Sequence, residues 1–176
     1  SNQEDSGLVS TDLIAVADGM GGHAGGEVAS RIAIHALSNL IETLTAVDAE
    51  SKEDLYMSAM DSIDYEIATA SAVKEELLGM GTTLTALLID GEEVKLLHVG
   101  DSRAYSWDGN SLTQLSVDHT VMQELLDQGR LTPEEVFDHP QRSLLTQALM
   151  GDSGIDPVLM SYEVKAGDKF LLCSDG

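Results

Sequence analysis

Three aspartates in this sequence share one setting, in which an apolar run leads to an acid beside a glycine. They are Asp18, Asp101 and Asp175, after apolar runs at 13–17, 96–99 and 170–173. Such a run predicts a strand that holds the carboxylate at the edge of a sheet. Glycine has no Cβ, so a cation can approach its carbonyl oxygen closely. Hard divalent cations prefer carboxylate, carbonyl and water oxygens, so the pattern indicates metal ligation.

A single Asp-Gly pair is also a common turn, and each segment alone is therefore weak evidence. The sequence adds an acid pair, Glu4 and Asp5, just before the first expected strand. Together with the three strand-end aspartates, this pair indicates a site that holds more than one cation through oxygen ligands.

The net charge restricts the classes of partner. Nine basic residues stand against 31 acidic ones, which gives a formal charge of −22 over 176 residues. A surface of this sign repels nucleic acids and anionic membranes, and we expect neither as a partner. It also repels a phosphorylated substrate unless bound cations reverse the local sign. No apolar run approaches the roughly 18 residues of a membrane span, and the lone Cys173, expected to be a buried hydrophobe, fits a reducing, cytoplasmic compartment.

The hydrophobic spacing predicts an α+β fold with mostly antiparallel strands. Hairpin signals at Asp90-Gly91 and at 108–110 join successive strands, unlike the alternation of a parallel α/β fold. Two long amphipathic helices are expected from Glu27 to Leu44 and from an N-cap at Ser51 to about Glu76.

The helical spacing places Leu37 of the first helix and Met60 and Ile63 of the second on the inward faces. Strands are expected at 6–9, 11–18, 82–89, 94–99, 103–107, 111–115, 158–164 and 169–174, and short helices at 119–129 and 132–139. The second short helix begins with a capping box from Thr132 to Glu135.

Seven segments, in order along nearly the whole chain, resemble the metal-dependent protein serine/threonine phosphatases of the protein phosphatase 2C type (the PPM family), and the bacterial branch most closely. They are residues 2–5, 18–26, 79–83, 98–103, 118–120, 139–143 and 172–176. The resemblance implies an α-β-β-α sandwich of two antiparallel sheets flanked by helices. Residues 1–176 would then form a single, incomplete catalytic domain with a helical flap insert at about 118–150.

The resemblance also implies the cofactors, two Mn²⁺ or Mg²⁺ ions with a possible third. Two such ions share a hydroxide that attacks the phosphorus atom and neutralise the phosphoryl oxygens. Asp18 would bridge both ions, Asp175 would bind one of them, and both would be essential to catalysis. Asp101 would border the third, weaker position. The full set of metal-binding residues implied is Glu4, Asp5, Asp18, Gly19 (through its carbonyl), Asp101 and Asp175.

The histidines and arginines divide into two groups. His119 and His139 flank the expected flap, and together with Arg142 they are candidates for contact with the substrate. A surface salt bridge is the alternative for Arg142. We expect His98 to be a hydrogen-bonded core residue and Arg103 to orient the loop after Asp101.

Three departures from the family pattern concern the start of the glycine loop and the two chain ends. Met20 occupies the place where many relatives outside bacteria carry a histidine proposed as a general acid. His23, three residues further on, is expected to order the loop and not to inherit that role. The phosphate-binding arginine of the family would lie one position before Ser1, and its last metal aspartate would lie beyond Gly176. We therefore expect the chain to be part of a longer catalytic domain.

The sequence favours a Mn²⁺- or Mg²⁺-dependent phosphatase acting on phosphoserine and phosphothreonine in proteins, and opposing a cognate kinase. A catalytically inactive, phosphatase-like binding or regulatory module is the alternative. The retained Asp18, Gly19 and Asp175 argue against it, because an inactive copy has no chemical reason to keep strand-end acids. A structural calcium domain is a third hypothesis, disfavoured because the sequence has no twelve-residue calcium loop with alternating ligands.

Overall fold

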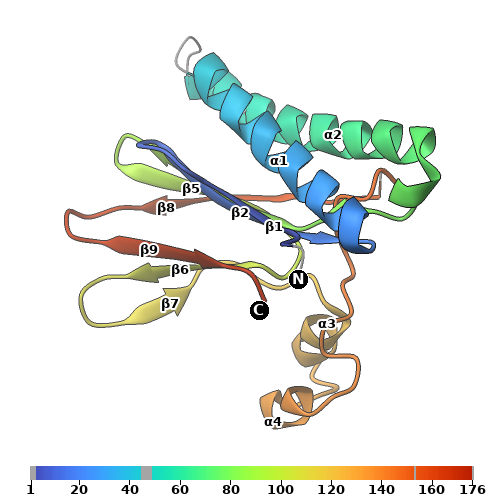
Figure 1. Ribbon diagram of the computed structural model, residues 1–176. Helices are drawn as coiled ribbons and strands as arrows, with labels where there is room; N and C mark the ends of the chain where they lie inside the picture. Colours follow the sequence, from blue (N-terminus) through green and yellow to red (C-terminus); the bar gives the residue numbers. More distant parts are fainter. Residues whose placement is uncertain (1–2, 45–48, 153, 176) are drawn as a thin grey trace.

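The fold is two antiparallel sheets stacked face to face, with a pair of long helices over the outer face of one of them (Figure 1). The computed structural model describes residues 3–44, 49–152 and 154–175. All strand pairs among these residues are antiparallel. The predicted fold class is therefore confirmed.

The larger sheet carries the first strands of the chain at one edge. Its order is β1-β2-β4-β5-β8, and the short β3 pairs with the end of β2. The bounds are β1 Asp5–Val9, β2 Leu13–Met20, β3 Gly81–Thr82, β4 Leu84–Asp90, β5 Glu93–Val99 and β8 Val158–Glu163. The second sheet has the order β7-β6-β9, from β6 Arg103–Trp107, β7 Leu112–Gln114 and β9 Lys169–Cys173.

The hydrophobic core lies in two layers. The larger layer joins the helix pair to the first sheet, and the inward helix positions expected from the sequence, such as Leu37, Met60 and Ile63, are fully buried there. The smaller layer lies between the two sheets and includes Leu96 and Ala104. Because side chains pack against both faces of the first sheet, residues 84–88 of β4 and 96–99 of β5 are buried whichever face they point to.

Both long helices begin before the predicted residues. Helix α1 spans His23–Leu44 and so starts four residues ahead of Glu27. The N–H groups of Gly25 and Gly26 already donate to the carbonyl of Gly22 at 2.9 and 3.1 Å, which closes a helical turn inside the glycine loop.

Helix α2 spans Ala49–Val73, so Ser51 lies inside it and the predicted N-cap was wrong. It also ends three residues before Glu76, because the backbone of Lys74 is extended and a 3₁₀ turn, η1 at Glu75–Leu77, follows.

Two short helices, α3 at Val121–Asp127 and α4 at Pro133–Phe137, form a protrusion beside the sheet ends (Figure 1). The start of α4 carries the capping box expected from the sequence, in which Thr132 and Glu135 each accept the backbone N–H of the other residue. Both helices are shorter than the predicted ranges. Gly129, at a φ of 66°, follows the C-cap of α3, and the N–H groups of Gly129 and Arg130 close the helix by donating to the carbonyls of Leu126 and Leu125 at 2.9 and 2.8 Å.

The end of β2 meets the start of α1 at a close contact between two glycines. A Cβ built on Gly19 would lie 2.0 Å from the carbonyl oxygen of Gly26, which is backbone and cannot rotate away. The turn that follows Asp18 can therefore pack against the helix only if this position is glycine.

We expect Gly19→Ala to lower the free energy of unfolding by roughly 1–3 kcal/mol, as overpacking of a tight interior does. Urea unfolding followed by circular dichroism measures this. Gly7→Ala in β1 is the matched control, since its Cβ would meet only an ordinary contact at 3.5 Å. Equal midpoints for the two variants would contradict the contact.

Candidate functional site

Two carboxylates meet because of the strand register. β1 and β2 pair so that Asp5 lies directly opposite Asp18. The N–H of Gly19 also donates to the carbonyl of Glu4 at 3.3 Å, which fixes the acid pair beside the end of β2. The hydroxyl of Ser174, which follows β9, donates to Asp5 at 3.1 Å. The start of the first sheet and the last strand of the second sheet thus converge at one place.

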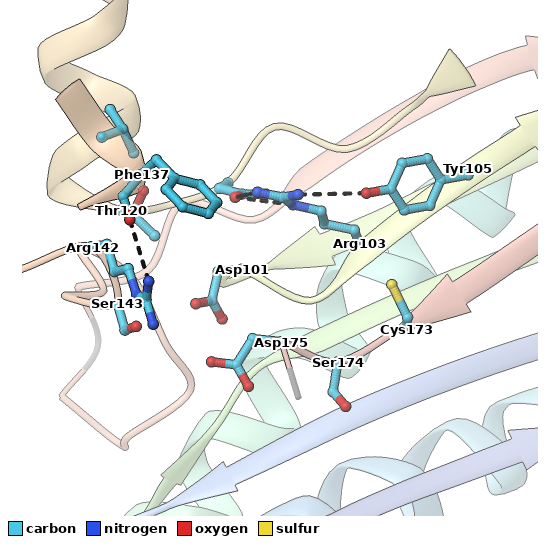
Figure 2. A pocket seen from close by; sticks show the side chains of 12 residues that line it. Asp101, Arg103, Tyr105, Thr120, Phe137, Arg142, Ser143, Cys173, Ser174 and Asp175 are labelled. Atoms are coloured by element: carbon cyan, nitrogen blue, oxygen red, sulfur yellow. Dashed lines mark hydrogen bonds and ion pairs between the residues drawn. The ribbon is translucent and has the colours of Figure 1, made fainter. Parts of the chain in front are cut away.

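The pKa of Asp18 reflects its burial and the other carboxyl groups that lie close to it. Partial burial, followed by the approach of Asp175 and Asp5, raises the pKa of Asp18 to about 7. Burial, followed by the charges of Asp175 and Asp118, raises the pKa of Asp101 to about 6. Figure 2 shows Asp101 and Asp175 on the same side of one pocket. Carboxyl groups from five separate segments therefore lie near the ends of the two sheets, where neighbouring ones repel each other.

Buried hydroxyl groups connect the loop of Asp18 to the loop of Asp101. The backbone N–H of Asp18 donates to the hydroxyl of Thr83 at 3.1 Å, and the hydroxyl of Thr82 donates to the carbonyl of Asp18 at 3.0 Å. Thr83 also bonds the hydroxyl of Ser102 at 2.8 Å, next to Asp101. Sequence reasoning gave these hydroxyls no role, although Gly81-Thr82-Thr83 and Asp101-Ser102 stood within the matched segments.

A histidine pair supports the turn before Asp101. His98 is buried, as expected for a core residue, and its ring bonds the Thr85 hydroxyl at 2.9 Å and the Val117 carbonyl at 3.0 Å. Nδ1 of His119 accepts the N–H of Gly100 at 3.1 Å. Burial lowers the pKa of His98 to about 4 and also lowers that of His119. His119 therefore holds the turn with one ring nitrogen, and its side chain is not among those that line the pocket of Figure 2.

Arg103 orients the neighbouring loop, as expected from the sequence. Its guanidinium forms a forked ion pair with Asp118, with the shortest contact at 2.6 Å. This hydrogen-bonded pair raises the pKa of Arg103. Asp118 was not singled out as a site residue, because an acid before a histidine carries no local signal of a partner fifteen residues earlier.

The aspartates open onto a cleft of about 470 Å³ between the sheet ends and the α3–α4 protrusion. Asp101 and Asp175 line one side, and Arg142, Ser143 and Phe137 line the other (Figure 2). Arg142 donates to the carbonyl of Phe137 at 3.2 Å, and no ion pair is found for it among the described side chains.

The remaining candidates lie apart from the cleft or outside the description. His139 does not line the cleft, and its ring accepts the N–H of Gln141 at 3.2 Å. The backbone of His23 starts α1, but its side chain lies outside the described part of the structure.

Cys173 was expected to be buried. It is half-buried and lines the cleft, because β9 ends there.

The donor set suits hard divalent cations. Its atoms are carboxylate oxygens and the carbonyl of Gly19, and no Lys or Arg of the described residues forms an ion pair with these aspartates. Across the described chain, no three His, Cys, Asp or Glu side chains form a ready-made ligand cluster. Burial and the neighbouring carboxyl groups raise the pKa of Asp18 to about 7 and that of Asp101 to about 6, and a nearby positive charge would favour the ionised forms.

Among the helices in the described ranges, none is long and apolar enough to cross a membrane.

We expect the free energy of unfolding of the cation-free protein to decrease as the pH rises from about 4 to about 7. The pKa of Asp18 is 3.8 in an unfolded chain and about 7 in the fold, so the folded state holds more protons in this interval. Asp18→Asn removes this titration. The variant should match the parent near pH 4 and exceed its stability above pH 7, by on the order of 1 kcal/mol after solvent screening.

Urea unfolding in EDTA from pH 4 to pH 8 measures the difference. Asp12→Asn, at an exposed acid between β1 and β2, is the control. If the free energy of unfolding of Asp18→Asn differed from that of the parent by the same amount at every pH, the pKa of Asp18 would not be raised by burial and the nearby carboxyl groups.

Comparisons with known proteins agree with this geometry. The family model for protein phosphatase 2C matches residues 3–176. The serine/threonine protein phosphatase PstP of Mycobacterium tuberculosis is 47% identical over 176 residues, which are 100% of this chain and 34% of that protein. A crystal structure of that phosphatase superposes with a TM-score of 0.90 at 46% identity, over 99% of this chain and 73% of the other. A crystal structure of a PstP catalytic domain in complex with two manganese ions superposes with a TM-score of 0.86 at 43% identity, over 99% of this chain and 72% of the other.

The chain thus spans about a third of the length of its mycobacterial relative. The predicted resemblance is confirmed over almost the whole chain, and this chain belongs to the protein phosphatase 2C family.

Proposed function

We propose that this chain carries the active site of a metal-dependent phosphatase that hydrolyses phosphoserine and phosphothreonine in proteins. The observation that carries the proposal is the convergence of Asp5, Asp18, Asp101 and Asp175, with the raised pKa values of Asp18 and Asp101. The matching relatives are serine/threonine phosphatases, and one of their structures holds two manganese ions. When bound, a pair of Mn²⁺ or Mg²⁺ ions lowers the pKa of water and neutralises the phosphoryl oxygens.

Each acid has a part in this proposal. Asp18, which lies between the other acids, would be a ligand of both ions, and the carbonyl of Gly19 would bind one of them. Asp175, from the second sheet, would bind the other ion. Glu4 and Asp5 would hold metal-bound waters or bind an ion directly, and Asp5 accepts a hydrogen bond of 3.1 Å from the Ser174 hydroxyl.

Asp101 has a separate role in the proposal, at a third and weaker ion position. It lies on the far side of Asp175, beside the ion pair of Arg103 and Asp118. Its loop is connected to the backbone of Asp18 through the Ser102 and Thr83 hydroxyls. Loss of its charge should therefore leave the inner ligands in place.

We further propose that residues 118–150 form the flap, which contacts the substrate across the cleft. Arg142 is best placed to meet an anionic group, because its guanidinium lines the cleft opposite Asp101 and Asp175. His119 and His139 remain proposed contacts that require movement, because each ring already accepts a backbone N–H. The proposal places the reaction in the cytoplasm, against phosphoproteins produced by a cognate serine/threonine kinase.

The main test is hydrolysis of p-nitrophenyl phosphate and of a phosphothreonine peptide with Mn²⁺. We expect chelation with EDTA to abolish turnover and Asp18→Ala to reduce it by at least a hundredfold. In the parent, free Mn²⁺ at a hundred times its Kd should stabilise the fold by about 2.7 kcal/mol through mass action. Asp18→Ala should lose this stabilisation.

The control is Asp61→Ala, on the exposed face of α2. It should keep both turnover and the response to Mn²⁺. Cation-dependent stabilisation without turnover would favour the inactive binding module. Turnover in EDTA would contradict the metal-dependent mechanism.

Asp101→Asn should behave differently from a change at Asp18. The variant keeps the shape of the side chain and removes charge only at the outer position. We expect it to retain the thermal stabilisation by Mn²⁺ and to lose about tenfold or more in turnover, as removal of one charge-stabilising group does. Differential scanning calorimetry and steady-state kinetics measure the two effects. Loss of all Mn²⁺ binding would show that Asp101 is an inner ligand.

A further inference from the structure

A second cavity, of about 340 Å³, lies next to the cleft. We call it the side pocket, and apolar side chains form most of its wall. They are Met20, Leu144, Leu145, Ala148, Met150 and Ile155. Ser143 lines both the cleft and the side pocket, so the two hollows adjoin along the same segment. Nothing in the proposed reaction uses the side pocket.

The side pocket also adjoins the carboxylate end of β2. Met20 follows Asp18 by two residues and pairs with Gly81 of β3. A Cβ on Gly81 would lie 2.6 Å from Cγ of Met150 and 3.4 Å from Cγ of Met20. Both methionine side chains therefore lie over Gly81, close to the end of β2 that carries Asp18.

The wall of the side pocket is held on both sides by backbone hydrogen bonds. Leu149 exchanges two of them with Thr82, at 3.0 and 2.9 Å. The N–H of Gly151 donates to the buried Asp64 of α2 at 2.7 Å. At the other end, the N–H of Val121 donates to the carbonyl of Leu144 at 3.0 Å. These bonds hold the part of the wall from residue 144 to residue 151 against α3, β3 and α2.

Two apolar side chains of this fixed wall remain open to solvent. Leu144 is 49% exposed and Met150 is 38% exposed, on a chain with a formal charge of −22. Exposed apolar side chains that are held in place beside a reaction site suit binding of an apolar group. Methionine adapts its shape to different partners, which suits a pocket that receives several related side chains.

We propose that the side pocket is a substrate subsite, which receives an apolar side chain close to the phosphorylated serine or threonine. The proposal rests on the phosphatase function above, because the phosphoryl group must first lie at the aspartates. An apolar side chain next to the phosphorylated residue of the substrate then reaches past Ser143 into the side pocket. The occupant is an aliphatic or methionine side chain. Acidic side chains are disfavoured by Asp152 at the pocket wall and by the net charge of the chain.

The test compares two phosphothreonine peptides that differ only beside the phosphoresidue, with leucine on both sides in one and glutamine in the other. We expect the unmutated protein with Mn²⁺ to prefer the leucine peptide by about tenfold in kcat/KM, a usual discrimination by an apolar pocket. In the double variant Leu144→Asn, Met150→Gln this ratio should fall close to one. Leu112→Asn in β7, 57% exposed and lining neither cavity, is the control and should keep the ratio.

Equal kcat/KM for the two peptides in the unmutated protein would overturn the subsite, as would an unchanged preference in the double variant. If neither peptide nor p-nitrophenyl phosphate is hydrolysed, the proposed reaction fails. The subsite is then judged by fluorescence anisotropy of the labelled peptides, where equal affinities overturn it. A double variant that altered only the sedimentation of the protein would identify the pocket as a contact between copies, and this too would overturn the proposal.

Discussion

Repulsion between carboxylates is the interaction on which the candidate site depends. Charges of one sign brought together at partly buried positions destabilise a fold unless something holds them there. In this protein the backbone does so, because the antiparallel register places Asp5 opposite Asp18 whatever their side chains prefer. The second sheet then brings Asp175 to the same place through the end of β9. Burial, followed by the approach of Asp175 and Asp5, raises the pKa of Asp18, and a bound cation would favour its charged form.

Close backbone packing and buried hydroxyls keep this arrangement in position. Gly19 and Gly26 let the end of β2 touch the start of α1, where any side chain would collide. Thr83 and Ser102 form a short bridge of hydrogen bonds from the backbone of Asp18 to the residue after Asp101. None of these groups ionises, so they can fix charged loops without changing the charge of the site.

The opposite wall of the site has a different construction. It comes from the segment between β7 and β8, which contributes Arg142 and Ser143 to the cleft and also forms much of the side pocket. Backbone bonds from Leu149 to Thr82 and from Gly151 to Asp64 anchor its far end to β3 and α2. The reaction site and the surface proposed to read the substrate therefore share one fixed support.

The sequence by itself determined the strand-end aspartates, the antiparallel hairpins and the family, because each depends on local spacing and residue type. It placed Leu37, Met60 and Ile63 in the core for the same reason. It missed the pairing of Arg103 with Asp118, the exposure of Cys173 to the cleft and the start of α1 within the glycine loop. Only the tertiary structure decided that Ser174 reaches Asp5, 169 residues away in the chain, and that His119 supports the turn at Gly100. Such contacts depend on how two sheets stack and where their strands end, and no local pattern of residues encodes that geometry.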